Sequence, residues 1–116
     1  MSFPDKEWLS RFVRYLQVEK NSSAHTIRNY TQDIEDFRLF VKQYEPHTFA
    51  HISELEVREY LTALYEKKYG RNSVARKISA LRSFYRFLLR EKLVQRNVFA
   101  QTHLPKQATK LPSFFV

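Results

Sequence analysis

The sequence predicts an all-α fold, a compact bundle of four main helices. Apolar residues recur in four long segments at the spacing of one helix face, i, i+3, i+4 and i+7. The chain of 116 residues also contains only one glycine, Gly70, and four prolines. Sheet-rich folds need tight turns with positive φ, which glycine supplies, so this scarcity favours few connections and long helices. Apolar residues make up 43% of the chain and aromatic residues 16%, which is enough for the core of one domain.

The first helix is predicted to run from about Asp5 to Lys20. It ends in a polar run, residues 21–23, whose side chains compete for backbone hydrogen bonds. One face of this helix is apolar and is expected to join the core. That face consists of Leu9, Phe12, Val13 and Leu16.

The second helix is predicted to begin after Ser23, because serine is a good N-cap residue. It is expected to continue to about Tyr44, since Pro46 follows and the residue before a proline avoids the helical region. Its apolar face consists of Ile27, Tyr30, Ile34, Phe37 and Val41.

The third helix is predicted to begin at Ser53, which forms a capping-box pattern with Glu56 three residues later. Gly70 is well placed to end this helix in a left-handed conformation. The fourth helix is predicted from about Ser73 to Leu93. Its apolar side consists of Val74, Ile78, Leu81, Phe84, Tyr85, Leu88 and Leu89.

The periodic pattern ends at about Arg96. Residues 1–103 are therefore expected to form the domain, and residues 104–116 an extended linker that contains Leu104-Pro105-Lys106 and Leu111-Pro112.

The positive charge of the chain is concentrated in one segment. The net charge is +8, and residues 67–96 carry ten Lys or Arg against one acid, Glu91. The rest of the chain has a net charge close to zero. A protein that presents one face to a polyanion has such a distribution, so nucleic acid is the favoured partner, with a solvated basic surface as the alternative.

The polar side of the fourth helix interleaves arginines with small residues. Small side chains let a helix axis approach a major groove, while arginines reach phosphates or the O6 and N7 atoms of guanine. A merely soluble helix usually mixes Glu with Lys, whereas this side has no acid before Glu91. DNA contact is therefore favoured over a plain solvated face. This side consists of Arg76, Ser79, Ala80, Arg82, Ser83, Arg86 and Arg90.

The start of the second helix offers a weaker candidate for DNA contact. His25, Thr26, Arg28 and Asn29 lie where the helix dipole and free N–H groups favour an anion. Further along, residues 33–36 include three acids, which phosphates would repel. A capped helix start with a solvated Arg28 is an equally good interpretation.

No pattern of residues points to catalysis, a metal site or a cofactor. The absence of cysteine excludes a disulfide framework and a thiolate zinc site. His47 and His51 are four residues apart but lie near Pro46 in a predicted loop without a third ligand, so they are read as a surface pair. His25 and Arg28 match the letters of a motif for phosphoryl transfer to tyrosine, without the companion residues. One glycine cannot form a phosphate-binding loop.

The sequence shows neither a secretory signal nor a membrane span. Residues 1–5 lack a basic flank followed by an apolar run, and no later segment has the length of a span. The lack of cysteine fits a reducing compartment. We therefore expect a cytoplasmic protein that binds no membrane and takes no small-molecule substrate.

Three segments resemble the N-terminal core-binding, SAM-like domain of Xer-type tyrosine recombinases. Residues 23–37, with the pattern S-x-x-T-x-x-x-Y-x-x-D-I-x-x-F, resemble its second helix, and residues 77–88, KISALRSFYRFL, resemble its fourth. Residues 104–112 resemble the linker to a C-terminal catalytic domain. The similarity is greatest to the XerC branch of Gram-positive bacteria, with XerD and phage-type integrases as alternatives. Asn97-Val98 replaces the usual Asn-Pro, which is expected to loosen the start of the linker.

The resemblance implies a helical bundle that forms half of a clamp around a recombination half-site in double-stranded DNA. Its second and fourth helices would lie against the DNA, although Asn72 and Ser73 could instead cap the fourth helix, and Lys77 lies at the apolar margin. Arg76, Arg82 and Arg28 are expected to contribute most. The candidate DNA-binding residues are His25, Thr26, Arg28, Asn29, Asn72, Ser73, Arg76, Lys77, Ser79, Ala80 and Arg82.

The resemblance also implies that this fragment is not an enzyme. The catalytic residues of the parent tyrosine recombinase would lie in the missing C-terminal domain, and the parent would act without a metal or nucleotide, as a tetramer, in chromosome dimer resolution. The alternative function is a helical protein-interaction domain whose basic face docks an acidic partner.

Overall fold

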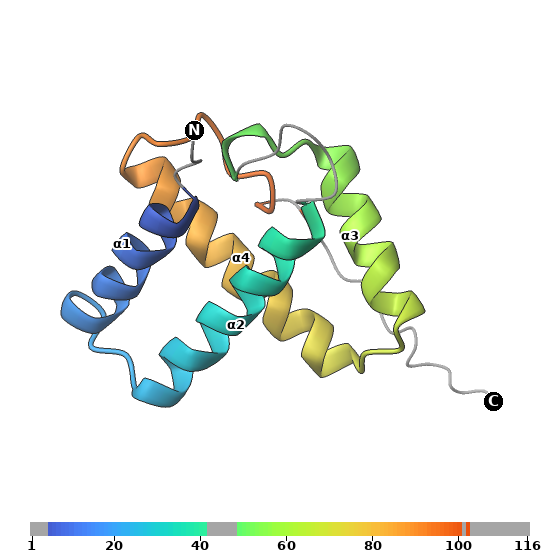
Figure 1. Ribbon diagram of the computed structural model, residues 1–116, viewed down its shortest axis with the longest axis horizontal. Helices are drawn as coiled ribbons and strands as arrows, with labels where there is room; N and C mark the ends of the chain where they lie inside the picture. The colour runs from blue at the N-terminus through green and yellow to red at the C-terminus, as the bar shows by residue number, and fades with distance from the viewer. Residues whose placement is uncertain (1–4, 42–48, 101, 103–116) are drawn as a thin grey trace.

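The computed structural model describes residues 5–41, 49–100 and 102, and within them the chain is all-α, which confirms the predicted fold class. α2 and α4 cross in the middle of the molecule, with α1 on one side and α3 on the other (Figure 1). The elements are α1 (Asp5–Val18), α2 (Ala24–Val41), the 3-10 helix η1 (Phe49–His51), α3 (Glu54–Glu66) and α4 (Arg71–Arg90). The predicted end of the second helix near Tyr44, His47 and the predicted linker 104–116 lie outside the described residues.

The core is rich in aromatic rings and joins all these elements. Phe84 of α4 is fully buried, with its ring centroid 5.3 Å from that of Phe12 in α1 and 4.8 Å from that of Phe49 in η1. The hydroxyl of Tyr85 donates a hydrogen bond to the carbonyl oxygen of Phe49 at 2.7 Å. The sequence did not predict η1, because a helix of three residues has no measurable periodicity.

Two helix starts that were predicted from capping residues are confirmed. The hydroxyl of Ser23 accepts a hydrogen bond from the backbone N–H of Thr26 at 3.1 Å, the N-cap arrangement for α2. At α3, the hydroxyl of Ser53 accepts from the backbone N–H of Glu56, and the Glu56 carboxylate accepts from the Ser53 N–H at 2.7 Å. This is the complete capping box.

The helix ends differ from the predictions. Gly70 does not end α3 in a left-handed conformation: its φ is −67°, and it is the N-cap residue of α4. Lys68 adopts positive φ instead, at 63°, and its N–H donates to the carbonyl of Tyr65. α1 and α4 end slightly earlier than predicted, each followed by a residue with positive φ, Asn21 and Lys92. These turns satisfy carbonyls that a helix end leaves unpaired.

The buried face of α4 is displaced from the predicted one. Leu89, which was expected on the apolar side, is 41% exposed. Phe87, which lay outside that side, is buried, with its ring centroid 5.6 Å from Phe12 and 4.9 Å from Tyr15. α1 therefore packs against a side of α4 that was predicted from the apolar periodicity to be exposed.

The chain after α4 packs back onto the bundle. Phe99 is fully buried, and its ring centroid lies 5.3 Å from that of Phe37. Asn97 accepts a hydrogen bond from the Phe99 N–H at 3.0 Å and donates one to the carbonyl of Arg82 at 3.1 Å. Val98 is also buried. Hydrogen bonds and apolar packing thus both hold the segment where Asn97-Val98 was expected to loosen the chain.

Tyr60 of α3 yields a stability prediction. Its side chain is 3% exposed, and within the described part of the chain its hydroxyl has no hydrogen-bond partner. Burial raises the pKa of this hydroxyl, and the nearby Asp36 and Asp33 raise it further. An unpaired buried polar group costs free energy, so Tyr60→Phe is expected to increase the free energy of unfolding by about 1 kcal/mol in urea titrations.

The same substitution has an expected pH dependence. Because the folded state raises the pKa of Tyr60 above its unfolded value of about 10, the stabilising preference for the neutral phenol holds below pH 10 and is lost as the pH rises further. The gain from Tyr60→Phe should therefore grow between about pH 9 and 11. A gain that is constant over this range would show that folding does not raise the pKa of Tyr60, and a loss of stability at neutral pH would show that the hydroxyl has a partner.

Candidate nucleic-acid interface

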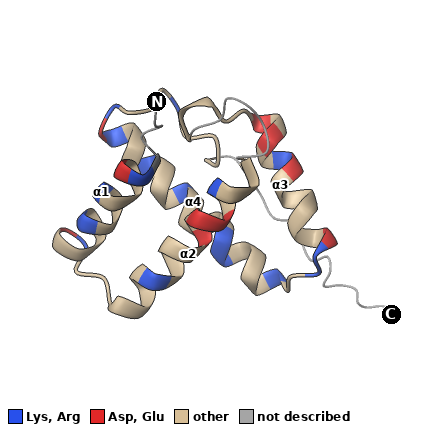
Figure 2. Ribbon diagram, viewed as in Figure 1, with Lys and Arg blue, Asp and Glu red and all other residues tan. Residues whose placement is uncertain are grey.

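One side of α4 forms an exposed polar stripe, here called the basic stripe. Its members are spaced alternately four and three residues apart, so they share one helix face. Figure 2 shows basic segments along α4 and an acidic stretch of α2 where the two helices cross. The basic stripe consists of Asn72, Arg76, Ser79, Ser83, Arg86 and Arg90, all exposed or partly exposed.

The arginines of the basic stripe differ in their partners. Arg90 pairs with Glu19 at 3.2 Å and Glu91 at 2.9 Å, and its guanidinium carbon lies 4.8 Å from the ring centroid of Tyr15. Arg86 is exposed, and no ion pair or hydrogen bond to its side chain exists among the described residues. Arg86 is therefore more available to an external anion than Arg90.

Arg76 is held by an acid that lies beneath it. Its Nε and Nη2 donate to Oδ2 and Oδ1 of Asp33 in α2, both at 2.9 Å. Asp33 is 0% exposed, whereas the side chain of Arg76 is 45% exposed. The hydrogen bonds to Asp33 raise the pKa of Arg76 above its ordinary value. Asp33 was expected among acids that repel phosphates, but its charge is buried and neutralised.

Lys77 and Ala80, which were predicted to contact DNA, are buried in this structure. Lys77 is 3% exposed, and its Nζ donates to Asp36 at 2.8 Å and to Asp33 at 3.2 Å. Burial alone would lower the pKa of Lys77, but the hydrogen bonds to both carboxylates raise it. Ala80 is fully buried in the core side of α4. Both belong to the displaced buried face of α4.

Arg82 is also placed differently from the prediction. Its Nε donates to the carbonyl of Phe99 at 3.1 Å, and its Nη2 donates to the carbonyl of Thr102 at 2.6 Å. The guanidinium therefore holds the chain that follows α4. The wheel of α4 placed Arg82 correctly on the polar side, but the position of these two carbonyls depends on the path of the returning chain.

The start of α2 presents the four predicted residues in one short stretch. The hydroxyl of Ser23 donates to that of Thr26 at 3.0 Å, so Thr26 belongs to the cap. Asn29 Nδ2 lies 3.1 Å from His25 Nε2. Arg28 is exposed and, among the residues that the structure describes, pairs with no acid. Arg28 keeps the accessibility that the sequence predicted for it.

Asn72 and Ser73 lie in the first turn of α4. The N-cap position of α4 is occupied by Gly70, so neither Asn72 nor Ser73 is the capping residue. No side chain caps this helix by a hydrogen bond. Asn72 is exposed and Ser73 partly buried. The first N–H groups of a helix lack intrahelical acceptors, so this turn carries a partial positive charge.

A groove of about 480 Å³, here called the basic groove, brings the start of α2 next to α4. Thr26 lies at this groove together with Ser83 and Arg86 of the basic stripe. Lys20 and Ser22, from the turn before α2, also line it. Sequence reasoning did not select Lys20, Ser83 or Arg86 as site residues, although the helical period places the last two in line with Arg76 and Ser79.

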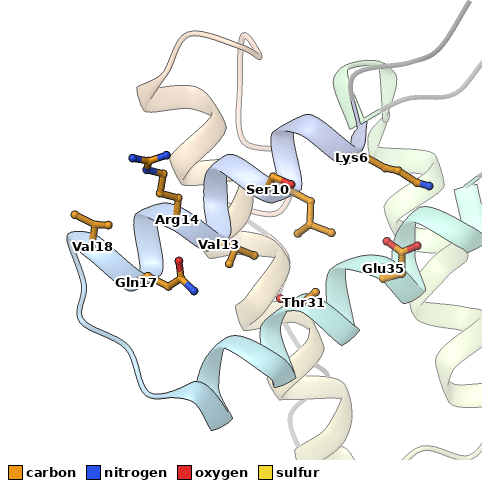
Figure 3. A pocket seen from close by; sticks show the side chains of 9 residues that line it. Lys6, Ser10, Val13, Arg14, Gln17, Val18, Thr31 and Glu35 are labelled. Atoms are coloured by element: carbon orange, nitrogen blue, oxygen red, sulfur yellow. The ribbon is translucent and has the colours of Figure 1, made fainter.

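A second groove of about 780 Å³ separates α1 from α2 (Figure 3). Its lining is mixed, with the apolar Leu9 and Val13 beside Lys6, Arg14 and Glu35. The hydrogen bond from Arg38 lowers the pKa of Glu35, so this carboxylate stays ionised at neutral pH. An acid in the lining makes this groove a poor match for a polyanion, unlike the basic groove.

The described residues contain no group of three or more His, Cys, Asp or Glu that could hold a metal ion. None of the helices in the described part of the chain is both long enough and apolar enough to cross a membrane.

Comparisons with known proteins place the chain among the tyrosine recombinases and phage integrases. The model of the family described as "Phage integrase, N-terminal SAM-like domain" matches residues 9–92. Tyrosine recombinase XerC of Halalkalibacterium halodurans is 51% identical over 114 residues, which cover 98% of this chain and 38% of the relative. Tyrosine recombinase XerC of Bacillus subtilis is 46% identical over 109 residues, with 94% of this chain and 36% of the relative covered. The chain thus spans little more than a third of these relatives, and no solved structure gives a significant match.

Proposed function

Because the chain belongs to the phage integrase N-terminal SAM-like domain family, we propose that it is the DNA-binding module of a Xer-like tyrosine recombinase. In this proposal, the start of α2 and the basic stripe of α4 grip one half of a recombination site in double-stranded DNA. Strand cleavage would be carried out by a catalytic domain that corresponds to the part of the relatives outside the matched region. Further subunits would complete a tetramer on paired sites. The recombinase would act in the cytoplasm, in chromosome dimer resolution.

The observation that carries the proposal is a set of cations without acidic partners at the basic groove and at the start of α2. Within the described residues, Lys20, Arg28 and Arg86 form no ion pair. Arg90, which also lines the groove, is paired with Glu19 and Glu91. A cation without a partner holds mobile counterions, and a DNA phosphate that displaces them gains the entropy of their release.

The shape of the basic groove also supports phosphate binding. Lys20, from the turn before α2, and Arg86 of α4 both line it, together with Thr26 of the first turn of α2. The N-terminal end of a helix favours an anion through its free N–H groups and its dipole. A duplex that follows the basic stripe would thus place its backbone at this groove. We expect non-specific affinity in the ordinary range of about 10⁻⁴–10⁻⁶ M at physiological salt.

Arg86→Gln tests the proposal. The variant is expected to bind a duplex of random sequence about tenfold more weakly at 0.1 M salt, and to reduce the slope of log affinity against log salt by about one. Fluorescence anisotropy of a labelled duplex measures both quantities.

Arg14→Gln is the matched control, because Arg14 is an exposed arginine of α1 that lines the other groove. It should leave the slope nearly unchanged. Equal losses in both variants would indicate attraction by net charge alone. No loss in Arg86→Gln would remove the basic groove from the interface and favour an acidic protein partner.

A further inference from the structure

We propose that Asp33 is a positioning residue that aims Arg76 at the edge of a guanine in the bound duplex. This inference rests on the proposed function and adds to it a specificity-determining residue and the buried acid that orients it. The basic groove would supply affinity, and the Asp33–Arg76 pair would supply discrimination between sequences.

The geometry of the pair leaves one edge of the guanidinium free. Arg76 uses Nε and Nη2 for two parallel hydrogen bonds of 2.9 Å to the two carboxylate oxygens of Asp33. In a planar guanidinium this occupies the side edge, and the remaining N–H groups of Nη1 and Nη2 form the end edge. Asp33 is fully buried while the Arg76 side chain is 45% exposed. Among the described residues no hydrogen bond to Nη1 is found, so the end edge is free for an external acceptor, and its two donors match the O6 and N7 acceptors of guanine.

The support beneath Arg76 is itself fixed. Lys77 Nζ donates to Asp33 at 3.2 Å and to Asp36 at 2.8 Å, so the carboxylate of Asp33 has partners on two sides. Both acids lie on α2 and both cations on α4, so the cluster ties the two helices together. A free arginine must lose its rotamer freedom when it binds, whereas Arg76 has lost that freedom already on folding.

The charges of this cluster point to discrimination and not to general attraction. Arg76 and Lys77 are balanced by Asp33 and Asp36, so the four side chains carry no net charge. Such a cluster attracts phosphates weakly, unlike the unpaired Arg86. Ser79 follows Arg76 on the basic stripe and is exposed. Its small side chain lets the axis of α4 approach the floor of a groove, where base edges lie.

The test is a selection from duplexes with a randomised segment, with sequencing of the bound fraction. Wild-type protein is expected to enrich guanine at a defined position. Arg76→Lys keeps the charge but loses the planar fork, and Asp33→Asn removes the bidentate partner. Both are expected to lose most of the enrichment at that same position and to keep the preferences elsewhere. Arg86→Gln should bind more weakly but keep the guanine preference.

Two measurements separate positioning from damage to the fold. Asp33→Asn removes a negative charge near the DNA, so its affinity for a random duplex should hold or rise, whereas partial unfolding would lower it for every sequence. Arg76→Lys leaves Asp33 paired with Lys77 and serves if Asp33→Asn does not fold.

Guanine enrichment that persists in Arg76→Lys or in a folded Asp33→Asn, or wild-type binding without any sequence preference, would overturn the inference while the proposed function stands. A wild-type protein that binds no duplex would overturn both.

Discussion

Asp33→Ala is expected to lower the free energy of unfolding by about 3–5 kcal/mol, a large part of the stability of a domain this size. The carboxylate of Asp33 is fully buried and accepts hydrogen bonds from both Arg76 and Lys77. Removing it leaves the buried ammonium of Lys77 with Asp36 as its remaining carboxylate partner. Losing one member of a buried ionic cluster costs far more than the cluster contributes, because the desolvated ammonium of Lys77 then keeps only part of its compensation. Urea unfolding followed by circular dichroism measures the change.

Glu35→Ala provides the control, because Glu35 lies on the same helix, is partly exposed and pairs with Arg38 three residues away. Surface pairs of this kind contribute little, so a loss below about 1 kcal/mol is expected. Similar small losses for both variants would mean that the α2–α4 cluster is hydrated and contributes nothing particular to the fold.

Phe84→Ala is expected to lower the free energy of unfolding by about 3–5 kcal/mol. The ring of Phe84 is fully buried, and it contacts Phe12 of α1, Phe49 of η1 and Tyr85 of its own helix. Its removal leaves a cavity at the place where these elements meet, and rings on separate helices cannot collapse fully into it. For a domain of about 100 residues, such a loss lowers the melting temperature by more than about 12 °C.

Leu89→Ala is the matched control on α4. The sequence places Leu89 on the apolar side, but the structure exposes 41% of it, so the loss should stay below about 1.5 kcal/mol. A loss as large as that of Phe84→Ala would indicate that Leu89 is buried as the sequence predicts. It would contradict the displaced buried face of α4.

The four helices could be predicted because each carries a long apolar period, and two starts because Ser23 and Ser53 are good caps. Their ends were less predictable. Gly70 was expected to adopt the positive φ that ends α3, but Lys68, two residues earlier, adopts it instead. Phe49 and Phe99 were missed because they lie outside periodic segments, yet both are fully buried.

The candidate interface was predicted only in outline. The helical wheel identified the polar side of α4, where Arg76 is exposed. Arg28 is exposed at the start of α2, as predicted. The wheel could not show that Arg76 is held by Asp33, because the two are 43 residues apart in the sequence. Nor could it show that Lys77 is buried, since pairing with acids on another helix makes burial of a lysine tolerable.

The most direct test of DNA binding is a salt titration of the wild-type protein on a short labelled duplex. Each phosphate neutralised contributes about −0.9 to the slope of log affinity against log salt. Lys20, Arg28 and Arg86 alone should therefore give a slope of about −3 or steeper. Measurable binding at low salt with this slope is the predicted result. Absence of binding at low salt, or an affinity that does not change with salt, would contradict the assignment of this chain as a DNA-binding module.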